Sequence, residues 1–360
     1  MPSPAAPGPL RVVPVLGVGE VSRDDDLAGM LLDALAATGM AVEEGDCLVV
    51  SSKVVSKALG LTWSGTREDA VAAGTVRVVA ERRGEGGGLT RVVESVAGPV
   101  MAAAGVDASN AGPSGDVLRL PDDSDAAAAA LRAAILARLG LPSGTALSVV
   151  LSDTAGRPWR AGLTDLALGS AGLHVLEDLR GSTDHDGRPL AVTLRAVADE
   201  VAAAADLVKG KADGVPAALV RGLDRSWFSP SGAGARSLVR TGPTDWFALG
   251  HVEAVRTALG AAPASRAAEM VGVASVSPDE PLGTRVGRVV ALALLHEPEA
   301  SADVGVDEGT ATAEVSLGAA DDYDLGRLVA RLEVAAASEG LRASMVGRAR
   351  GTATFRLTQS

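Results

Sequence analysis

The chain has very few aromatic residues: Phe, Trp and Tyr together make up 2% of its 360 residues. Its cores must therefore be built from Ala, Val and Leu, and an apolar fraction of 47% is large enough to build them. This composition excludes an intrinsically disordered chain. A chain of this length corresponds to about two or three domains.

Cysteine and histidine are also scarce. The one cysteine, Cys47, allows no disulfide within the chain and no thiolate metal cluster, as is usual for a cytosolic protein. None of the four histidines pairs with another at the spacing of a zinc site. We therefore expect neither zinc chemistry nor internal disulfides.

Basic residues are fewer than acidic ones, and long apolar runs are absent from the sequence. Lys and Arg number 33 against 45 for Asp and Glu, which gives a formal net charge of −12. A negative chain repels a polyanion at long range, so nucleic acid is not an expected partner. No apolar run reaches the ~18–20 residues of a membrane span, and the N-terminus lacks the pattern of a signal peptide. We expect a soluble, cytoplasmic protein.

Lysine is the rarest of the charged residues, and its placement is informative. Four of the 33 basic residues are lysines, in two close pairs, Lys53 with Lys57 and Lys209 with Lys211. Lysine supplies a compact, flexible point charge that suits phosphate oxygens, whereas arginine supplies a rigid planar fork. Chance placement on solvated helix ends is the alternative, but two pairs beside Ser or Gly favour phosphate binding.

The apolar pattern alternates between strand-like and helix-like stretches. Strands are expected at 11–16, 47–50, 76–80, 146–151 and 217–220, and helices at 27–38, 126–140 and 190–207. Residues 227–245, rich in Ser, Gly and Pro, predict a connector or a lid. Beyond them we expect strands at 267–275, 288–296 and 310–316, a helix at 325–337 and a hairpin at 341–357. The expected fold is mixed α/β (α+β), with one domain over residues 1–250 and a small α+β module over residues 251–360.

The two classical nucleotide-binding loops are absent. The chain contains no G-x-x-x-x-G-K-[ST], and Gly17-Val18-Gly19 does not complete a G-x-G-x-x-G. Acidic and polar residues stand instead at the ends of predicted strands, where open α/β sheets place their ligands.

Two segments could hold a cation. In the turn 105–110, Asp107 and Asn110 place a carboxylate and a carboxamide three residues apart, although an Asx turn is the favoured explanation for this segment taken alone. The apolar strand that ends at Asp153 and Thr154 would put a carboxylate and a hydroxyl at the edge of the sheet, as in sites that hold Mg²⁺ against phosphates. The alternative for this second segment is a helix N-cap.

A third segment could hold phosphates. Residues 209–216 contain Lys209, Lys211 and two glycines, and a Gly-rich loop lets backbone amides approach phosphate oxygens. A helix C-cap with basic residues at the negative end of the helix dipole is the alternative.

Taken together, these segments resemble the coenzyme F420-0:L-glutamate ligase family. The resemblance covers about residues 10–250 and rests on 52–57, 105–110, 152–160, 209–216 and Arg221-Gly222. It implies an enzyme that adds γ-linked L-glutamate to the deazaflavin precursor F420-0 with GTP as co-substrate, in the biosynthesis of coenzyme F420. It further implies transfer of the γ-phosphoryl group to the precursor's carboxylate, giving an acyl phosphate that the glutamate amine attacks, and a homodimer.

The resemblance also implies roles for individual residues. Mg²⁺ or Mn²⁺ would be held by Asp107 and Asp153, a second ion by Thr154, and K⁺ is a further possible ion. Asp107, Asp153 and Lys211 would be catalytic. The residues implied to contact GTP are Gly17, Val18, Gly19, Glu20, Ser52, Lys53, Lys57, Asn110, Lys209, Gly210, Asp213 and Gly214.

Lys211 stands where the family is expected to place a ligand of the second metal. A protonated lysine cannot ligate a metal, so its ammonium could replace that ion's charge. Two other functions stay open: a metal-dependent GTP hydrolase or phosphotransferase with another acceptor, and a catalytically silent nucleotide-binding module. The sequence predicts no function for residues 251–360.

Overall fold

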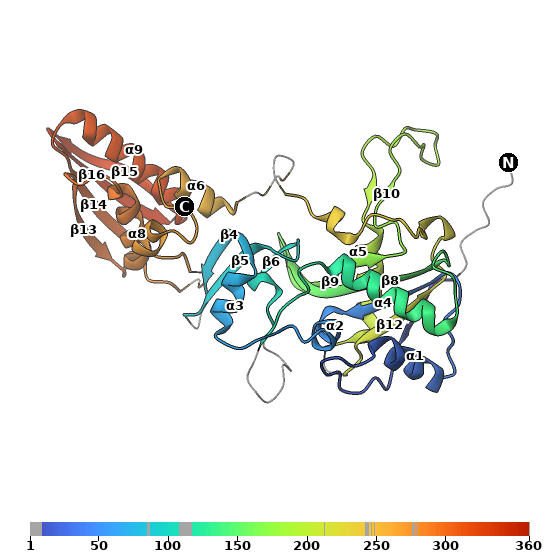
Figure 1. Ribbon diagram of the computed structural model, residues 1–360. Helices are drawn as coiled ribbons and strands as arrows, with labels where there is room; N and C mark the ends of the chain where they lie inside the picture. Colours follow the sequence, from blue (N-terminus) through green and yellow to red (C-terminus); the bar gives the residue numbers. More distant parts are fainter. Residues whose placement is uncertain are drawn as a thin grey trace. The chain divides into compact units, whose positions relative to one another are not determined.

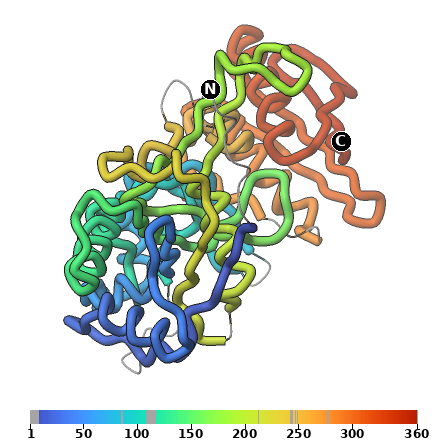
Figure 2. The backbone as a smooth tube through the Cα atoms, turned by 90° about the vertical axis from the view of Figure 1, so that its right-hand side faces the viewer, coloured from blue at the N-terminus to red at the C-terminus, as the bar shows by residue number. Residues whose placement is uncertain are grey.

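The computed structural model describes residues 9–84, 87–107, 117–211, 213–241, 245, 247, 249–275, 277 and 279–359. The chain forms two compact units (Figures 1 and 2). The first contains Met1–Val76 and Glu94–Thr241, and the second contains Arg77–Val93 and Gly242–Ser360. In contrast to the boundary expected near residue 250, the second unit thus includes a segment from the first hundred residues.

A five-stranded mixed sheet forms the centre of the first unit. Its order is β1 (Arg11–Pro14), β12 (Ala217–Arg221), β2 (Asp46–Ser51), β8 (Leu147–Arg157) and β9 (Arg160–Ala171). β2 and β8 run parallel, with Ser51 opposite Ser152, and the other neighbours are antiparallel. The strands expected around residues 47–50, 146–151 and 217–220 are confirmed, and together they make the buried middle of this sheet.

Helices cover both faces of the sheet, as the alternation along β2 requires. Leu48 and Val50 face α1 (Leu27–Ala37) and α4 (Ser124–Leu139), whereas Cys47 and Val49 face α5 (Val197–Lys209). The α5 side of the core is made largely of alanine and valine, with Ala198, Ala202 and Ala205 fully buried. Small side chains let the helix approach the sheet closely, so the core needs no aromatic rings.

Shorter elements complete this part of the chain. They are α2 (Ser52–Ala58), β3 (Thr62–Trp63), α3 (Arg67–Ala73), β4 (Thr75–Arg83), β5 (Leu89–Ser95), β6 (Val100–Ala102), β7 (Val117–Leu118), β10 (Glu177–Asp178) and β11 (Leu194–Arg195). The strands among them form three small sheets, in the orders β3-β7, β4-β5-β6 and β10-β11, and most of β4 and β5 belongs to the second unit. The helix expected from residue 190 begins only at Val197, because β11 and a short loop precede it.

The later part of the second unit is a four-stranded antiparallel sheet with helices. The sheet order is β13 (Ser301–Asp307), β14 (Thr312–Gly318), β16 (Thr352–Gln359) and β15 (Leu341–Ala349). Its core joins Phe355, Leu357 and Val315 of the sheet to α8 (Leu282–Leu294) and α9 (Asp322–Ser338). α6 (His251–Ala258) and α7 (Arg266–Val271) precede these elements. The helix and hairpin expected after residue 325 are confirmed.

Two of the expected strands in this unit are wrong. Residues 266–271 form α7, and most of 288–296 belongs to α8. The β-branched pair Val289-Val290 suggested a strand, but the buried residues Leu282, Val286, Val289 and Ala293 recur at the three- and four-residue spacing of a helix face. In the described part of the chain, no helix combines the length and the apolar character that crossing a membrane would require.

Candidate functional site

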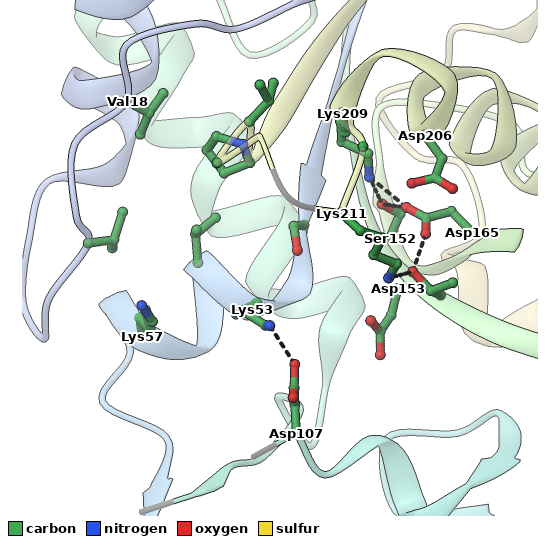
Figure 3. A pocket seen from close by; sticks show the side chains of 18 of the residues that line it. Val18, Lys53, Lys57, Asp107, Ser152, Asp153, Asp165, Asp206, Lys209 and Lys211 are labelled. Atoms are coloured by element: carbon green, nitrogen blue, oxygen red, sulfur yellow. Dashed lines mark hydrogen bonds and ion pairs between the residues drawn. The ribbon is translucent and has the colours of Figure 1, made fainter. Parts of the chain in front are cut away.

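A cavity of about 420 Å³ opens in the first unit where the parallel pairing of β2 with β8 ends, at Ser51 and Ser152 (Figure 3). Adjacent parallel strands present their carboxyl ends at the same edge of a sheet, which is where α/β proteins bind ligands. The start of α2, the end of α5 and the loops before α1 and β12 also line it. Its lining residues are Val18–Val21, Ser51, Lys53, Val54, Lys57, Asp107, Ser152–Thr154, Asp165, Asp206, Lys209–Lys211 and Gly214–Pro216.

All four lysines of the chain line this one cavity. Lys53 forms an ion pair with Asp107 at 2.6 Å, and Lys57 forms one with Glu20. Lys209 and Lys211 come from the opposite wall, at the end of α5. None of the 29 arginines is among the lining residues that the structure describes. The two lysine pairs, far apart in the sequence, therefore serve a single site.

A chain of hydrogen bonds runs along the hairpin of β8 and β9 beneath the cavity. Thr154 lies directly opposite Asp165 in the register of the two strands. The Thr154 hydroxyl donates to Asp165 Oδ1 at 2.8 Å, and the Ser152 hydroxyl donates to Asp165 Oδ2 at 2.8 Å. Lys209 Nζ donates to Asp165 Oδ2 at 2.6 Å and to Ser152 Oγ at 2.7 Å, while Lys211 Nζ donates to Thr154 Oγ1.

The Lys209–Asp165 pair is almost completely buried, with side-chain exposures of 5% and 4%. Burial acts to raise the pKa of Asp165, but the Lys209 ammonium and the hydrogen bonds from Lys209, Thr154 and Ser152 outweigh it and hold this pKa below its usual value. Asp165 is therefore ionised, and it can only accept hydrogen bonds.

Asp153 is in the opposite electrostatic situation. Burial raises its pKa from 3.8 to about 6, and the carboxylates of Asp165 and Asp107 add to this, against the Thr154 backbone N–H and the Lys211 ammonium. A carboxylate that is costly to ionise beside another carboxylate gains from a bound cation. Figure 3 shows the Asp153 carboxylate on the side of the cavity where Asp107 lies.

The donor set at this point fits a hard cation only in part. Within the described residues, no group of three or more His, Cys, Asp or Glu side chains could hold a metal ion. Mg²⁺, however, is usually bound by one or two carboxylates together with water and the phosphates of a substrate. Asp107 and Asp153 thus fit a divalent cation whose other ligands come from a bound phosphate compound.

Comparison with known proteins identifies the family. A sequence model of the family described as F420-0:Gamma-glutamyl ligase matches residues 16–222, which is more than half of the chain. The chain belongs to this family. Every residue that lines the cavity lies within the match.

Several relatives of the F420-0:gamma-glutamyl ligase family are similar over most of their own length. Coenzyme F420:L-glutamate ligase of Methanopyrus kandleri is 37% identical over 257 residues, covering 66% of this chain and 97% of that protein. The protein of the same name from Methanothermobacter thermautotrophicus is 36% identical over 256 residues, covering 66% and 98%. The one from Haloarcula marismortui is 36% identical over 237 residues, covering 60% and 88%. The resemblance expected from the sequence is confirmed, and the chain is a ligase.

Most of the residues that the ligase resemblance singled out meet in the cavity. Those that line it are Val18, Gly19, Glu20, Lys53, Lys57, Asp107, Asp153, Thr154, Lys209, Gly210, Lys211 and Gly214. Gly17 and Asp213 do not line it, and Ser52 is buried and lines a much smaller adjoining pocket. Asn110 lies outside the described residues. The roles of all these residues stay predictions.

The sequence did not point to Asp165 or Asp206, and it gave Ser152 no role beyond its place in the segment 152–160; all three line the cavity. Nor did it show that Asp153 and Thr154 lie inside a strand: β8 continues to Arg157, so neither residue caps a helix. At the other wall, α5 ends at Lys209 and Gly210 has a φ of 62°, so the C-cap interpretation is confirmed there. The positive φ at this point favours glycine, which has no Cβ.

Proposed function

We propose that the first unit is a cytoplasmic, GTP-dependent and divalent-metal-dependent ligase that adds L-glutamate to coenzyme F420-0. The observation that carries this proposal is the meeting of all four lysines with Asp107 and Asp153 in one cavity, inside the segment that matches the family. Ammonium groups and a carboxylate-bound cation are what a nucleoside triphosphate requires.

The charges of the cavity support the metal dependence. Its lining includes five carboxylates, those of Glu20, Asp107, Asp153, Asp165 and Asp206, against the four lysines. A cavity with this balance does not attract a triphosphate by itself, so a divalent cation must supply the missing positive charge. Held by Asp107 and Asp153, Mg²⁺ or Mn²⁺ would neutralise the phosphate oxygens.

The reaction follows from the chemistry of a carboxylate, which an amine attacks only after one oxygen has become a leaving group. The F420-0 carboxylate oxygen forms a bond to the γ-phosphorus of GTP, and the bond from that phosphorus to the β-phosphate oxygen breaks. The glutamate amine then attacks the carbonyl carbon, phosphate leaves, and the nitrogen loses a proton. The chain binds and orients the phosphates through Lys53, Lys57 and Lys211 and excludes water.

This course requires no nucleophile from the protein. Cys47 is fully buried, and burial raises the pKa of its thiol to about 12, so it does not act as one. The described lining of the cavity contains neither cysteine nor histidine.

One assay tests the proposal against its alternatives. Purified protein is incubated with GTP, Mn²⁺, L-glutamate and F420-0, and the masses of the products are measured by mass spectrometry. The proposal expects F420-0 to gain one glutamyl residue only when GTP is present. Release of GDP without consumption of glutamate would instead identify a hydrolase or a phosphotransferase with another acceptor. Nucleotide binding without turnover would identify a silent binding module.

The pH dependence of metal binding is a first prediction. Asp153 holds a cation only when ionised, and its pKa of about 6 means that protons compete below that pH. The affinity for Mn²⁺ should therefore be constant above about pH 7 and fall by about tenfold per pH unit below about pH 6. A titration followed by electron paramagnetic resonance measures it. An affinity that stays constant down to about pH 5 would contradict the assignment of Asp153.

The oligomeric state is a second prediction. We expect a homodimer, as the family resemblance implies, and the surface of the first unit offers apolar area for one. At the free end of the β8–β9 hairpin, Trp159 is 81% exposed and Leu163 is 67% exposed. Sedimentation at micromolar concentration should give a dimer, and Trp159→Glu with Leu163→Glu should weaken it. A monomeric wild-type chain would refute the prediction.

A further inference from the structure

The hydroxyl of Thr154 has only one proton, and the structure shows where it goes. Thr154 donates to Asp165 Oδ1 at 2.8 Å, so toward the cavity it presents lone pairs alone. A group with only lone pairs can accept from a cation but cannot donate to a phosphate oxygen. Thr154 is thus unsuited to contact a phosphate directly.

The direction of this hydrogen bond is imposed by the groups behind it. Asp165 also accepts from Ser152 at 2.8 Å and from Lys209 at 2.6 Å, and both side chains of the Lys209–Asp165 pair are at most 5% exposed. An ionised carboxylate has no proton to give, so Thr154 cannot reverse the bond and act as its acceptor. With 4% of its side chain exposed, Asp165 is little accessible to water that would compete for these hydrogen bonds.

The cavity side of Thr154 is occupied by Lys211. The Lys211 ammonium donates one of its three N–H groups to Thr154 Oγ1. Lys211 itself is exposed and lines the cavity, so its remaining N–H groups are available to a ligand there. All the donors along this wall therefore point, directly or through Thr154, toward Asp165.

Building on the proposed nucleotide site, we propose that Asp165 is a positioning residue for phosphate binding. By taking the only proton of Thr154, it makes that hydroxyl the acceptor that holds the Lys211 ammonium toward the phosphate oxygens of the nucleotide. The Lys211 ammonium and a second divalent cation would repel each other at this one oxygen, so Thr154 does not hold both at once. The wall at Thr154 thus carries a fixed ammonium, and the exchangeable cation sits at Asp107 and Asp153.

A double-mutant cycle tests this role. The affinity for the non-hydrolysable β,γ-imido analogue of GTP, with saturating Mg²⁺, is measured by calorimetry for the wild type, Asp165→Asn, Lys211→Met and the double variant. Each single change should weaken binding by roughly tenfold, the scale of one lost charge-assisted hydrogen bond. The double variant should bind no more weakly than Lys211→Met, because at saturating Mg²⁺ the proposed effect of Asp165 on the phosphates runs through Lys211.

Two variants separate this role from a merely structural one. Asp199→Asn is the matched control: this carboxylate on α5 accepts from the Ala167 backbone N–H of β9 at 2.9 Å and lies outside the cavity lining. It should alter the melting temperature and leave the analogue affinity within about twofold of the wild type. Thr154→Ser keeps the hydroxyl and should bind like the wild type, whereas Thr154→Val should bind like Lys211→Met.

Asp165→Asn leaves the Lys209 ammonium without its buried partner, so the paired variant Asp165→Asn with Lys209→Met replaces it in the cycle if the single variant does not fold. Unchanged affinity in the Asp165 variant, or losses that multiply with those of Lys211→Met, would overturn the inference. The ligase proposal is tested separately. If the four proteins show the expected affinities but the wild type adds no glutamate, the ligase proposal fails and the role of Asp165 stands.

Discussion

Replacing Asp153 with Asn is expected to abolish glutamate addition. The change removes one of the two carboxylates proposed to hold the cation and keeps the side-chain volume, so the fold should persist. Loss of a group that stabilises transferring phosphates costs on the order of a thousandfold in rate. Turnover with GTP at saturating Mg²⁺, together with Mn²⁺ binding, measures the effect. Asp33→Asn, which changes an exposed carboxylate on α1, is the control and should behave like the wild type.

In the absence of metal, Asp153→Asn should be at least as stable as the wild type. The raised pKa of Asp153 means that the metal-free folded chain loses stability as the pH rises from about 4 to 6, because above that range a buried charge must be carried. The asparagine side chain of the variant carries no charge, so at about pH 8 Asp153→Asn should gain at most ~3 kcal/mol of unfolding free energy. Wild-type turnover at limiting metal, or a clearly destabilised variant, would show that Asp153 has a structural role instead.

Replacing Lys209 with Met is expected to have the largest effect on stability. It leaves Asp165 buried and ionised with no ammonium beside it, and breaking a buried pair in this way costs about 3–5 kcal/mol. Removing both charges, in Lys209→Met with Asp165→Asn, should restore most of this loss because no charge is then left unpaired. Urea unfolding followed by circular dichroism measures the free energy of unfolding of each variant.

Lys57→Met provides the matched control for this prediction. It also breaks a lysine–carboxylate pair in the same cavity, but its partner Glu20 is 80% exposed and is hydrated when left alone. Exposed pairs contribute about 0–1 kcal/mol, so this variant should unfold close to the wild type. If Lys57→Met and Lys209→Met lost equal amounts of unfolding free energy, burial would not determine how strongly the Lys209–Asp165 pair stabilises the fold.

The sequence predicted the part of the site that depends on residue type. Because lysine is so rare in this chain, the pairs Lys53/Lys57 and Lys209/Lys211 indicated a common role, and the structure places all four in one cavity. Asp153 and Thr154 were found because an apolar run predicts the strand before them, and Asp107 was found in a small polar turn. Side chains at the ends of neighbouring strands can then be expected to meet.

Asp165 could not be found in this way because its place depends on an irregularity of the β8–β9 hairpin. Arg157 pairs with Arg160 at the turn, and regular pairing from there would put Thr154 opposite Leu163. A register shift between Gly156 and Arg157 brings Asp165 opposite Thr154 instead. A bulge leaves little trace in a single sequence, so the partner of Thr154 becomes visible only in three dimensions.

The sequence analysis also did not predict that residues 77–93 belong to the second unit, and the reason is similar. Residues 77–93 have the pattern of ordinary strands and give no sign of belonging with residues beyond 241. Their place is set by tertiary contacts: the Ala264 N–H donates to Glu81 at 3.0 Å, and the Glu81 N–H donates to Glu253 at 2.8 Å. Local patterns predict elements, whereas such distant pairings are determined by packing over the whole unit.

The gathering of every lysine into one cavity also determines how the chain responds to amine chemistry. Apart from the terminal α-amine, an acylating reagent, an aldehyde or a lysine-modifying enzyme has no target in this chain other than the walls of that cavity. Any acetyl group or label found on a lysine therefore marks the candidate site, and isotope-labelled methyl groups on the four amines would report on that site without background from the remaining surface. For this chain, lysine modification and occupation of the site are competing events.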